Sequence, residues 1–212
     1  MVKGGISQIR NDYKKQKLRK EDLDKNPIRQ FQIWLDEAIK SELNEPTAMT
    51  LATADKNGKP SARIVLLKSI DQNGFVFFTN YKSKKGIELN QNPNAALVFY
   101  WSELERQVRV EGMVSKLSRN ISKEYFNSRP KESRISAIIS PQSTVIPNRQ
   151  FLEKRVEKFL KDKKEIKIPD NWGGFNLNPS TIEFWQGREN RLHDRFLYRR
   201  KNNDWEIVRL AP

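Results

Sequence analysis

The densest group of residues able to do chemistry lies near the C-terminus, in the segment FWQGRENRLHDR, residues 184–195. Arg191, His193 and Arg195 are two residues apart, so in an extended conformation their side chains project to one face. Such groups repel one another unless an anion lies between them, and guanidinium groups bind phosphate oxygens in bidentate fashion. The pattern therefore predicts an anion site, with an exposed strand face as the simpler alternative.

A second basic group is RIVLLK, residues 63–68, where Arg63 and Lys68 bracket four apolar residues. In a regular strand, side chains five residues apart lie on opposite faces, so the two cations serve different environments unless a bulge intervenes. The alternative is a half-buried strand with charged ends.

Two further polar groups could contact a ligand. Arg129 and Ser133 belong to SRPKES, residues 128–133, at the boundary of two helical stretches, where free amides and the helix dipole favour phosphate. A surface arginine at an ordinary helix boundary is the alternative. Gln107 lies among apolar neighbours in a predicted strand, so it either pairs locally or contacts a polar ring edge.

Composition excludes several classes of protein. Cysteine is absent and His193 is the only histidine, which excludes disulfide scaffolds, thiolate zinc sites and multi-histidine metal sites. Phosphate-loop, serine-hydrolase and zinc-protease motifs are missing. No apolar run suits a signal peptide or a membrane span, so a cytoplasmic location without membrane contact is expected. The net charge of +14 suggests anionic partners, namely nucleic acid, a membrane surface or small phosphorylated molecules, with a solvated basic surface as the simpler alternative.

The elements that position these residues follow from periodicity. Asn26 and Pro27 predict the start of a helix that ends near Asn44. Further helices are expected over 83–91, from Ser118 to before Pro130, over 131–140 and over 148–163. Short β-type runs separated by turn signals predict strands at 47–54, 61–69, 75–79, 95–101, 105–117, 174–178, 181–187, 194–201 and 204–210.

Hairpin-linked strands with helices inserted between them predict a mainly β (α+β) fold, an antiparallel barrel with helical additions. Residues 1–25 are polar and basic and are predicted to form a mobile N-terminal arm. Residues 26–212 are predicted to form a single domain. The glycine-rich turn of a Rossmann domain is missing, so a cofactor would be held differently.

Several separated motifs resemble the pyridoxamine 5'-phosphate oxidase family. IEFWQGRENRLHDR looks like the family signature, and RIVLLK, ERQV, YFNSRP, PQS and the terminal RLAP follow in the family's order and spacing. The resemblance extends from Ile9 to Pro212, and several motifs together are far more specific than one.

The resemblance implies an FMN-binding split β-barrel that acts as a homodimer, with flavin bound in two clefts at the subunit interface. It also implies oxidation of pyridoxine 5'-phosphate or pyridoxamine 5'-phosphate to pyridoxal 5'-phosphate. Oxygen would reoxidise the flavin and yield hydrogen peroxide, and the amine substrate would also release ammonia. On this reading the partners are these small molecules and O2, and no nucleic acid is expected.

The same resemblance assigns flavin contacts and substrate contacts. The flavin contacts would be Arg63, Ile64, Val65, Leu66, Leu67, Lys68, Phe78, Thr79, Lys84, Lys85, Gln107, Gln142, Ser143, Trp185 and Arg195. The substrate contacts would be Lys68, Tyr125, Arg129, Ser133, Arg191 and His193, with Arg10 and Tyr13 in a segment that closes over the substrate. Arg191 and His193 would orient the reacting carbon and are the candidate catalytic residues, and no general base is assigned.

Three positions depart from the family pattern. Phe78 stands where Tyr is common, Lys84 where Arg is frequent, and Glu45 where Asp is common. The first two changes remove a hydroxyl and replace a guanidinium fork by a point charge. Two alternative functions are another FMN split-barrel oxidoreductase and a basic nucleic-acid-binding module.

Overall fold

A computed structural model describes residues 12–163, 165–202 and 204–212 of the chain. The chain folds into two compact units. Unit 1 comprises the described part of residues 1–49, with 97–111 and 180–212, and unit 2 comprises residues 50–96 and 112–179. Strands β1, β5, β6 and β7 each contribute residues to both units.

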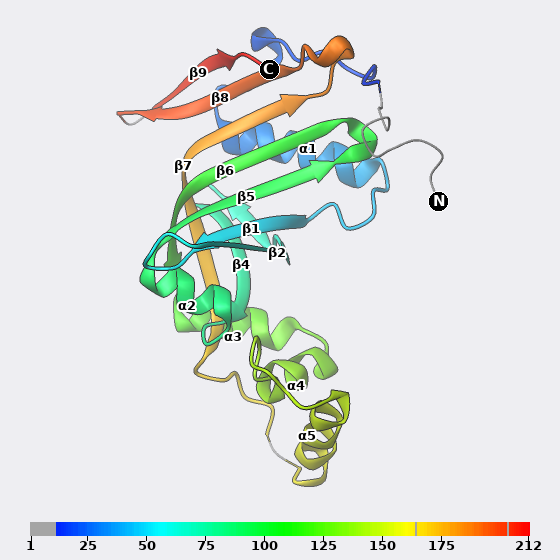
Figure 1. The fold of residues 1–212 in the computed structure, drawn as a ribbon, viewed down its shortest axis with the longest axis vertical. Helices are drawn as coiled ribbons and strands as arrows, with labels where there is room; N and C mark the ends of the chain where they lie inside the picture. Colours follow the sequence, from blue (N-terminus) through cyan, green and yellow to red (C-terminus); the bar gives the residue numbers. More distant parts are fainter. Residues whose placement is uncertain (1–11, 164, 203) are drawn as a thin grey trace. The chain divides into compact units, whose positions relative to one another are not determined.

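Strands make up most of the regular structure, as predicted (Figure 1). The strands are β1 (Ala48–Ala54), β2 (Pro60–Leu66), β3 (Ser69–Asp71), β4 (Gly74–Asn80), β5 (Asn94–Trp101), β6 (Arg106–Lys116), β7 (Trp172–Gln186), β8 (Asp194–Lys201) and β9 (Asp204–Leu210). The helices are η2 (Lys20–Asp22), α1 (Pro27–Lys40), α2 (Lys84–Gln91), η3 (Ser102–Leu104), α3 (Arg119–Ser128), α4 (Lys131–Ile139), α5 (Arg149–Lys161) and η4 (Glu189–Arg191).

The strands form one sheet with the order β2-β1-β5-β6-β7-β4-β3, and β8 pairs with both β7 and β9. The pairs β3–β4, β4–β7, β7–β8 and β8–β9 are antiparallel. The two Asn-Gly turns behave as predicted, because Gly58 and Gly74 take positive φ values of 80° and 134°. The mainly β fold with helical additions is thus confirmed.

The predicted helix starts are confirmed by their caps. The Asn26 side chain accepts hydrogen bonds from the backbone N–H groups of Ile28 and Arg29, at 2.9 and 3.3 Å. Ser118 accepts one from Ile121 at 3.4 Å. Helix α1 ends at Lys40 rather than near Asn44, because Glu42 adopts the left-handed conformation with φ 53° and stops the helix.

Two strand predictions are wrong. The runs 174–178 and 181–187 form the single strand β7, which passes through Pro179. Pairing with β4 ends at Leu177 and pairing with β8 begins at Thr181, so the missing N–H of Pro179 falls where β7 changes partner. The run 61–69 is interrupted after Leu66, and a separate short strand, β3, begins at Ser69.

Each unit buries its own aromatic side chains. In unit 1, Phe31 packs against Phe99 at 4.7 Å between ring centroids, and Trp34 packs against Phe184 at 5.1 Å. In unit 2, Phe77 and Phe175 lie 5.8 Å apart. Burial of this apolar surface provides most of the favourable free energy of folding.

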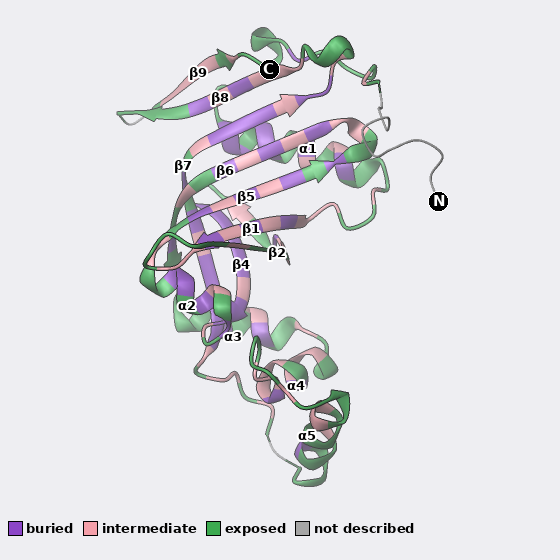
Figure 2. Ribbon diagram, viewed as in Figure 1, coloured by how far each residue is buried: buried purple, intermediate pink, exposed green. Residues whose placement is uncertain are grey.

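Helices α4 and α5 pack together through a small apolar cluster in unit 2 whose buried members are Ile135, Ile139 and Phe159. The rest of α5 is largely exposed (Figure 2), as predicted for this charged helix. Among the described residues, no helix combines the length and apolar character needed to cross a bilayer.

Residues 12–25 belong to unit 1. Within them, Leu18 and Leu23 are buried, and the backbone carbonyl of Asp24 accepts a 2.7 Å hydrogen bond from the Tyr198 hydroxyl. The division into an arm over 1–25 and a single domain over 26–212 stays a prediction.

Candidate functional site: a cationic pocket and a histidine cluster

Unit 2 contains a pocket of about 550 Å3, within the range of small-molecule sites. Its lining comes from β2, β4, α2, α3, α4 and the start of β7. The lining residues are Arg63, Ile64, Val65, Leu66, Lys68, Phe78, Thr79, Asn80, Lys85, Tyr125, Arg129, Glu132, Ser133, Ser136, Ala137, Ser140, Gln142 and Trp172.

Twelve of the residues predicted for flavin or substrate share this pocket. They are Arg63, Ile64, Val65, Leu66, Lys68, Phe78, Thr79, Lys85, Tyr125, Arg129, Ser133 and Gln142. Arg63 and Lys68 line one pocket rather than two environments, because β2 ends at Leu66 and regular alternation stops before Lys68.

The remaining predicted residues are placed elsewhere. Leu67, Lys84 and Ser143 belong to unit 2 but are not among the residues lining the pocket. Tyr13, Gln107, Trp185, Arg191, His193 and Arg195 belong to unit 1. Arg10 lies outside the described residues.

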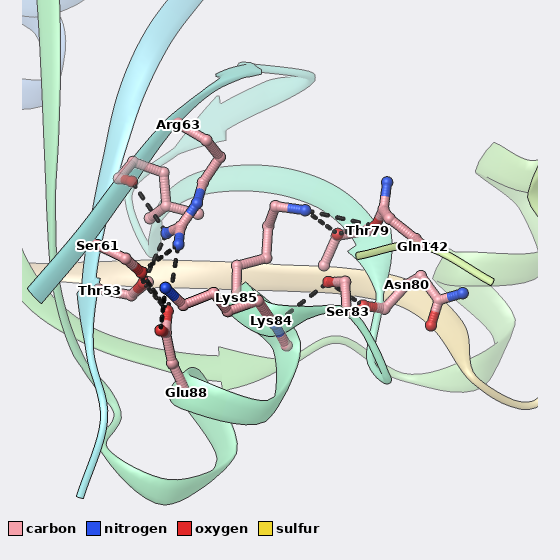
Figure 3. A network of polar contacts seen from close by, with 12 residues as sticks. Thr53, Ser61, Arg63, Thr79, Asn80, Ser83, Lys84, Lys85, Glu88 and Gln142 are labelled. Atoms are coloured by element: carbon pink, nitrogen blue, oxygen red, sulfur yellow. Dashed lines mark hydrogen bonds and ion pairs between the residues drawn. The ribbon is translucent and has the colours of Figure 1, made fainter. Parts of the chain in front are cut away.

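The Arg63 side chain is fixed by a polar network (Figure 3). Its Nη1 donates to the carbonyl of Leu51 at 3.1 Å and to Thr53 Oγ1. Its Nη2 donates to Ser61 Oγ and to Glu88 Oε2, the latter at 3.1 Å. The guanidinium is therefore held in one orientation at the wall of the pocket.

A second cation, Lys85, lies at the first turn of α2. Its Nζ donates to Thr79 Oγ1 and to Gln142 Oε1, both at 3.3 Å, and both acceptors line the pocket (Figure 3). Burial lowers the pKa of Lys85, and the charge of Arg63 lowers it further. Both effects disfavour an isolated positive charge, and an anion in the pocket would offset them.

Arg129 lines the same pocket and supports the prediction of a phosphate site. Its guanidinium lies 4.9 Å from the centre of the Trp172 ring, and its Nη1 is buried without a hydrogen-bond partner among the described residues. Burial lowers the pKa of Arg129. A buried donor without a partner is costly, so this geometry favours an acceptor such as a phosphate oxygen.

An aromatic stack forms the wall beside Arg129. Phe78 and Tyr125 are stacked with centroids 3.9 Å apart, and Trp172 is stacked with Phe78 at 5.5 Å. Phe78, which departs from the family pattern, thus contributes a ring face where a tyrosine would add a hydroxyl. Trp172 was not identified from the sequence as a site residue. The feature of the sequence that could have indicated it is its position directly before Gly173 and Gly174.

Those two glycines let β7 approach its neighbours within unit 2. A Cβ on Gly174 would lie 2.9 Å from the Phe78 ring, and one on Gly173 would lie 2.2 Å from the Tyr81 hydroxyl oxygen. A larger residue in place of Gly174 would therefore disturb the aromatic wall, and one in place of Gly173 would displace Tyr81.

In unit 1, His193 lies in an aromatic cluster with Tyr13 and Trp185. Its ring centroid is 5.7 Å from that of Tyr13 and 4.6 Å from that of Trp185. The backbone N–H of Arg188 donates to Nδ1 of His193 at 3.1 Å, so Nε2 carries the proton of the neutral ring. Burial lowers the pKa of His193, followed by the charges of Arg191 and Arg195. His193 is therefore a neutral donor near pH 7.

The prediction of one extended run through 191, 193 and 195 is wrong for Arg191. Arg191 belongs to η4 and has a φ of 61°, whereas β8 begins only at Asp194. Arg195 lies in β8, where its Nε donates to Glu183 at 2.8 Å and its Nη1 donates to the carbonyl of Ala211 at 2.8 Å. The electrostatic proximity of both arginines to His193 is nevertheless retained.

The chemistry of the pocket fits a phosphorylated organic cofactor. It combines cationic groups, neutral donors and an aromatic wall, the features that bind a phosphate ester and a planar ring. Among the described residues, no group of three or more His, Cys, Asp or Glu side chains could hold a metal ion.

Comparison with known proteins supports this description. Residues 35–161 match the family model described as pyridoxamine 5'-phosphate oxidase. Residues 172–212 match the model of the pyridoxine 5'-phosphate oxidase C-terminal dimerisation region.

Two curated relatives are similar over their full length. The pyridoxine/pyridoxamine 5'-phosphate oxidase of Leptospira interrogans is 54% identical over 210 residues, which are 98% of each chain. The enzyme of the same name from Polynucleobacter asymbioticus is 53% identical over 208 residues, 98% of this chain and 99% of the relative.

Solved structures show the same fold. PhzG from Burkholderia lata, in complex with tetrahydrophenazine-1-carboxylic acid, has a TM-score of 0.86 and 31% identity over 91% of this chain and 95% of its own. An FMN-binding protein related to pyridoxamine 5'-phosphate oxidase from Nostoc punctiforme has a TM-score of 0.71 at 18% identity, covering 90% of this chain and 100% of its own. The predicted split-barrel fold is confirmed, and the chain belongs to the pyridoxamine 5'-phosphate oxidase family of oxidoreductases.

Proposed function

We propose that this protein is an FMN-dependent oxidase that converts pyridoxine 5'-phosphate or pyridoxamine 5'-phosphate to pyridoxal 5'-phosphate. The alcohol and O2 would give the aldehyde and H2O2. The amine, O2 and water would give the aldehyde, NH3 and H2O2. Full-length identity of 54% to a curated enzyme of that name supports this assignment.

The pocket provides groups for two phosphate esters. Arg63 and Lys85, with Thr79 and Gln142 beside Lys85, form one group suited to the FMN phosphate. Arg129 forms the centre of a second group, with Tyr125 and Ser133, suited to the substrate phosphate. Separate cationic groups would let both molecules bind together.

Bound FMN would supply the hydride acceptor and then pass the electrons to O2. The protein would bind, orient and shield the reactants. The stacked rings of Phe78, Tyr125 and Trp172 would form an apolar wall that excludes water from one side of the pocket. His193, as a neutral Nε2–H donor, would hydrogen-bond the substrate without adding a positive charge.

The unit 1 residues are proposed to complete the cleft in a homodimer. The match of residues 172–212 to a dimerisation region supports this oligomeric state. The flavin clefts of the family lie at the subunit interface, so the predicted residues of the two units can come from different subunits. Gln107, Trp185 and Arg195 would then contact FMN, and Arg191 and His193 would contact the substrate.

The single observation that carries the proposal is the buried Nη1 of Arg129, which has no partner among the described residues, in a pocket that also contains Lys85. The test is to load the purified protein with FMN and measure H2O2 and pyridoxal 5'-phosphate from pyridoxine 5'-phosphate. Pyridoxine without its phosphate is the control and should be a much poorer substrate. Turnover without H2O2, or equal turnover of both compounds, would contradict the proposal.

Binding experiments separate this function from the other two. A different FMN split-barrel oxidoreductase would bind FMN but fail to oxidise either vitamer phosphate. A nucleic-acid-binding module would bind short DNA or RNA with a steep salt dependence and would show no stabilisation by FMN.

A further inference from the structure

Glu88 is a buried carboxylate that is not among the residues lining the pocket and has no part in the function proposed above. It lies on α2, its side chain is only 6% exposed, and it forms an ion pair with Arg63 at 3.1 Å. We propose that Glu88 is a positioning residue that holds Arg63 in the orientation needed to recognise the FMN phosphate. This inference rests on the proposed function of the pocket.

The hydrogen bonds around Glu88 have one consistent direction. Thr53 Oγ1 donates to Glu88 Oε2 at 2.5 Å, and Ser61 Oγ donates to the same oxygen at 2.6 Å. Both hydroxyl oxygens in turn accept from Arg63. Each hydroxyl thus uses its proton on the carboxylate and its lone pairs on the guanidinium, an arrangement that favours an ionised Glu88.

Loss of the carboxylate would leave this network without its common acceptor. The Thr53 and Ser61 hydroxyls could then rotate, and Arg63 would lose its only charged partner among the described residues. A partly buried guanidinium without its counter-charge favours other orientations. Arg63 would then have to be ordered again each time the ligand binds, which weakens binding.

Helix α2 carries both Glu88 and Lys85, the second cation of the pocket. Lys85 and Glu88 are three residues apart, and the Glu88 carboxylate acts electrostatically on Lys85 in the direction that raises its pKa. Arg63 acts in the opposite direction. Glu88 therefore offsets part of the effect of Arg63 on Lys85, and both cations line the pocket.

The test compares FMN with riboflavin, which has the same ring but no phosphate. Full-length apoprotein is titrated with each ligand, and binding is followed by quenching of flavin fluorescence. In Glu88→Ala, the Kd for FMN should rise about tenfold, whereas the Kd for riboflavin should change less than about twofold. Glu88→Gln keeps the shape and one acceptor oxygen, so its FMN affinity should lie between those of Glu88→Ala and the wild type.

The glutamine variant also separates positioning from simple charge. If the carboxylate acted only by repelling the phosphate, Glu88→Gln would bind FMN more tightly than the wild type, and the inference would be wrong. If Glu88→Ala does not fold, Glu88→Gln alone decides: weaker FMN binding than in the wild type supports positioning, and tighter binding supports charge repulsion. Glu153→Ala, which removes a half-exposed carboxylate paired with Arg149 on α5, is the matched control and should leave both affinities unchanged.

A double-mutant cycle tests whether Glu88 acts through Arg63. In an Arg63→Ala background, Glu88→Ala should change the FMN Kd by less than about twofold, because the guanidinium that Glu88 positions is already missing. Equal losses of FMN and riboflavin affinity, or additive effects of the two substitutions, would overturn the inference. A wild-type protein that binds neither flavin would instead overturn the proposed function.

Discussion

At the scale of single residues, partial burial beside other cations distinguishes several of the groups proposed to act from the ordinary surface charges. Arg129 has a buried donor with no partner among the described residues, and Lys85 and His193 have lowered pKa values because they are half-buried and lie near arginines. Surface ion pairs such as Arg149–Glu153 are exposed to solvent, and such pairs contribute little to the free energy of unfolding. The pocket uses four basic residues, Arg63, Lys68, Lys85 and Arg129, of the 40 in the chain.

Trp172 should determine how well Arg129 binds the substrate phosphate. Trp172→Leu removes the ring beneath the guanidinium, so the KM for pyridoxine 5'-phosphate should rise about three- to thirtyfold, with a smaller change in kcat. Trp172→Phe keeps a ring and should lie nearer the wild type. Steady-state kinetics below the melting temperature of each variant checks this, and an unchanged KM in Trp172→Leu would show that Arg129 needs no aromatic support.

His193 offers a direct reading of the local charge, because it is the only histidine in the chain. Its pKa should lie below the ordinary value of about 6.5. Arg191→Ala removes a positive charge that disfavours protonation, so it should raise the pKa of His193. The pH titration of the single imidazole C2–H signal by NMR measures both values.

Lys201→Ala, at the other end of β8, is the control for this titration and should leave the His193 pKa where it is. A fall in the pKa after Arg191→Ala would show that the arginine acts by some other route than its charge.

At the scale of elements, the start of α2 is fixed by close backbone packing. Ser83 caps the helix by accepting a hydrogen bond from the backbone N–H of Gly86 at 3.4 Å, and its hydroxyl donates to the carbonyl of Asn80 at 2.6 Å. A Cβ on Gly86 would lie 2.5 Å from the carbonyl oxygen of Tyr81 and 2.7 Å from that of Asn80. The helix can therefore approach the end of β4 only with glycine at this position, and this approach places Lys85 at the pocket.

Gly86→Ala should consequently destabilise the protein. In an unconstrained helix this change stabilises by about 0.5–1 kcal/mol, but here the clash should lower the free energy of unfolding by about 1–3 kcal/mol. Urea denaturation measures the change. Asn90→Ala, at an exposed position of the same helix, should stay within about 0.5 kcal/mol of the wild type. A Gly86→Ala protein more stable than the wild type would show that α2 can shift without penalty.

At the scale of the whole molecule, the residues predicted for one cleft are divided between two units. Arg63, Lys85 and Arg129 belong to unit 2, whereas His193 and Arg195 belong to unit 1. The C-terminal match to a dimerisation region covers β7, β8 and β9, the strands that carry or adjoin the unit 1 residues. We therefore expect each cleft to combine groups from two subunits.

Complementation between subunits tests this expectation. Arg129→Ala and Arg195→Ala chains, carrying different tags, are expressed together and the mixed dimer is isolated. If each cleft combines the two units from different subunits, one cleft carries both substitutions and the other carries neither, so about half of the wild-type activity should return. Homodimers of each variant should stay impaired, and no recovery in the mixed dimer would place both residues of a cleft in one chain.

The sequence by itself determined the strand-rich fold, most helix starts and the family, because caps, Asn-Gly turns, alternation and motif order are local properties of the chain. It also identified the cations of the pocket. Only the tertiary structure decided that β7 runs through Pro179, that Arg191 leaves the extended conformation, and that Arg63 and Lys68 share one pocket. It alone showed Trp172 beneath Arg129 and Glu88 behind Arg63. Such contacts join segments far apart in the chain, so pairing, burial and electrostatic neighbours are set by packing and not by spacing along the sequence.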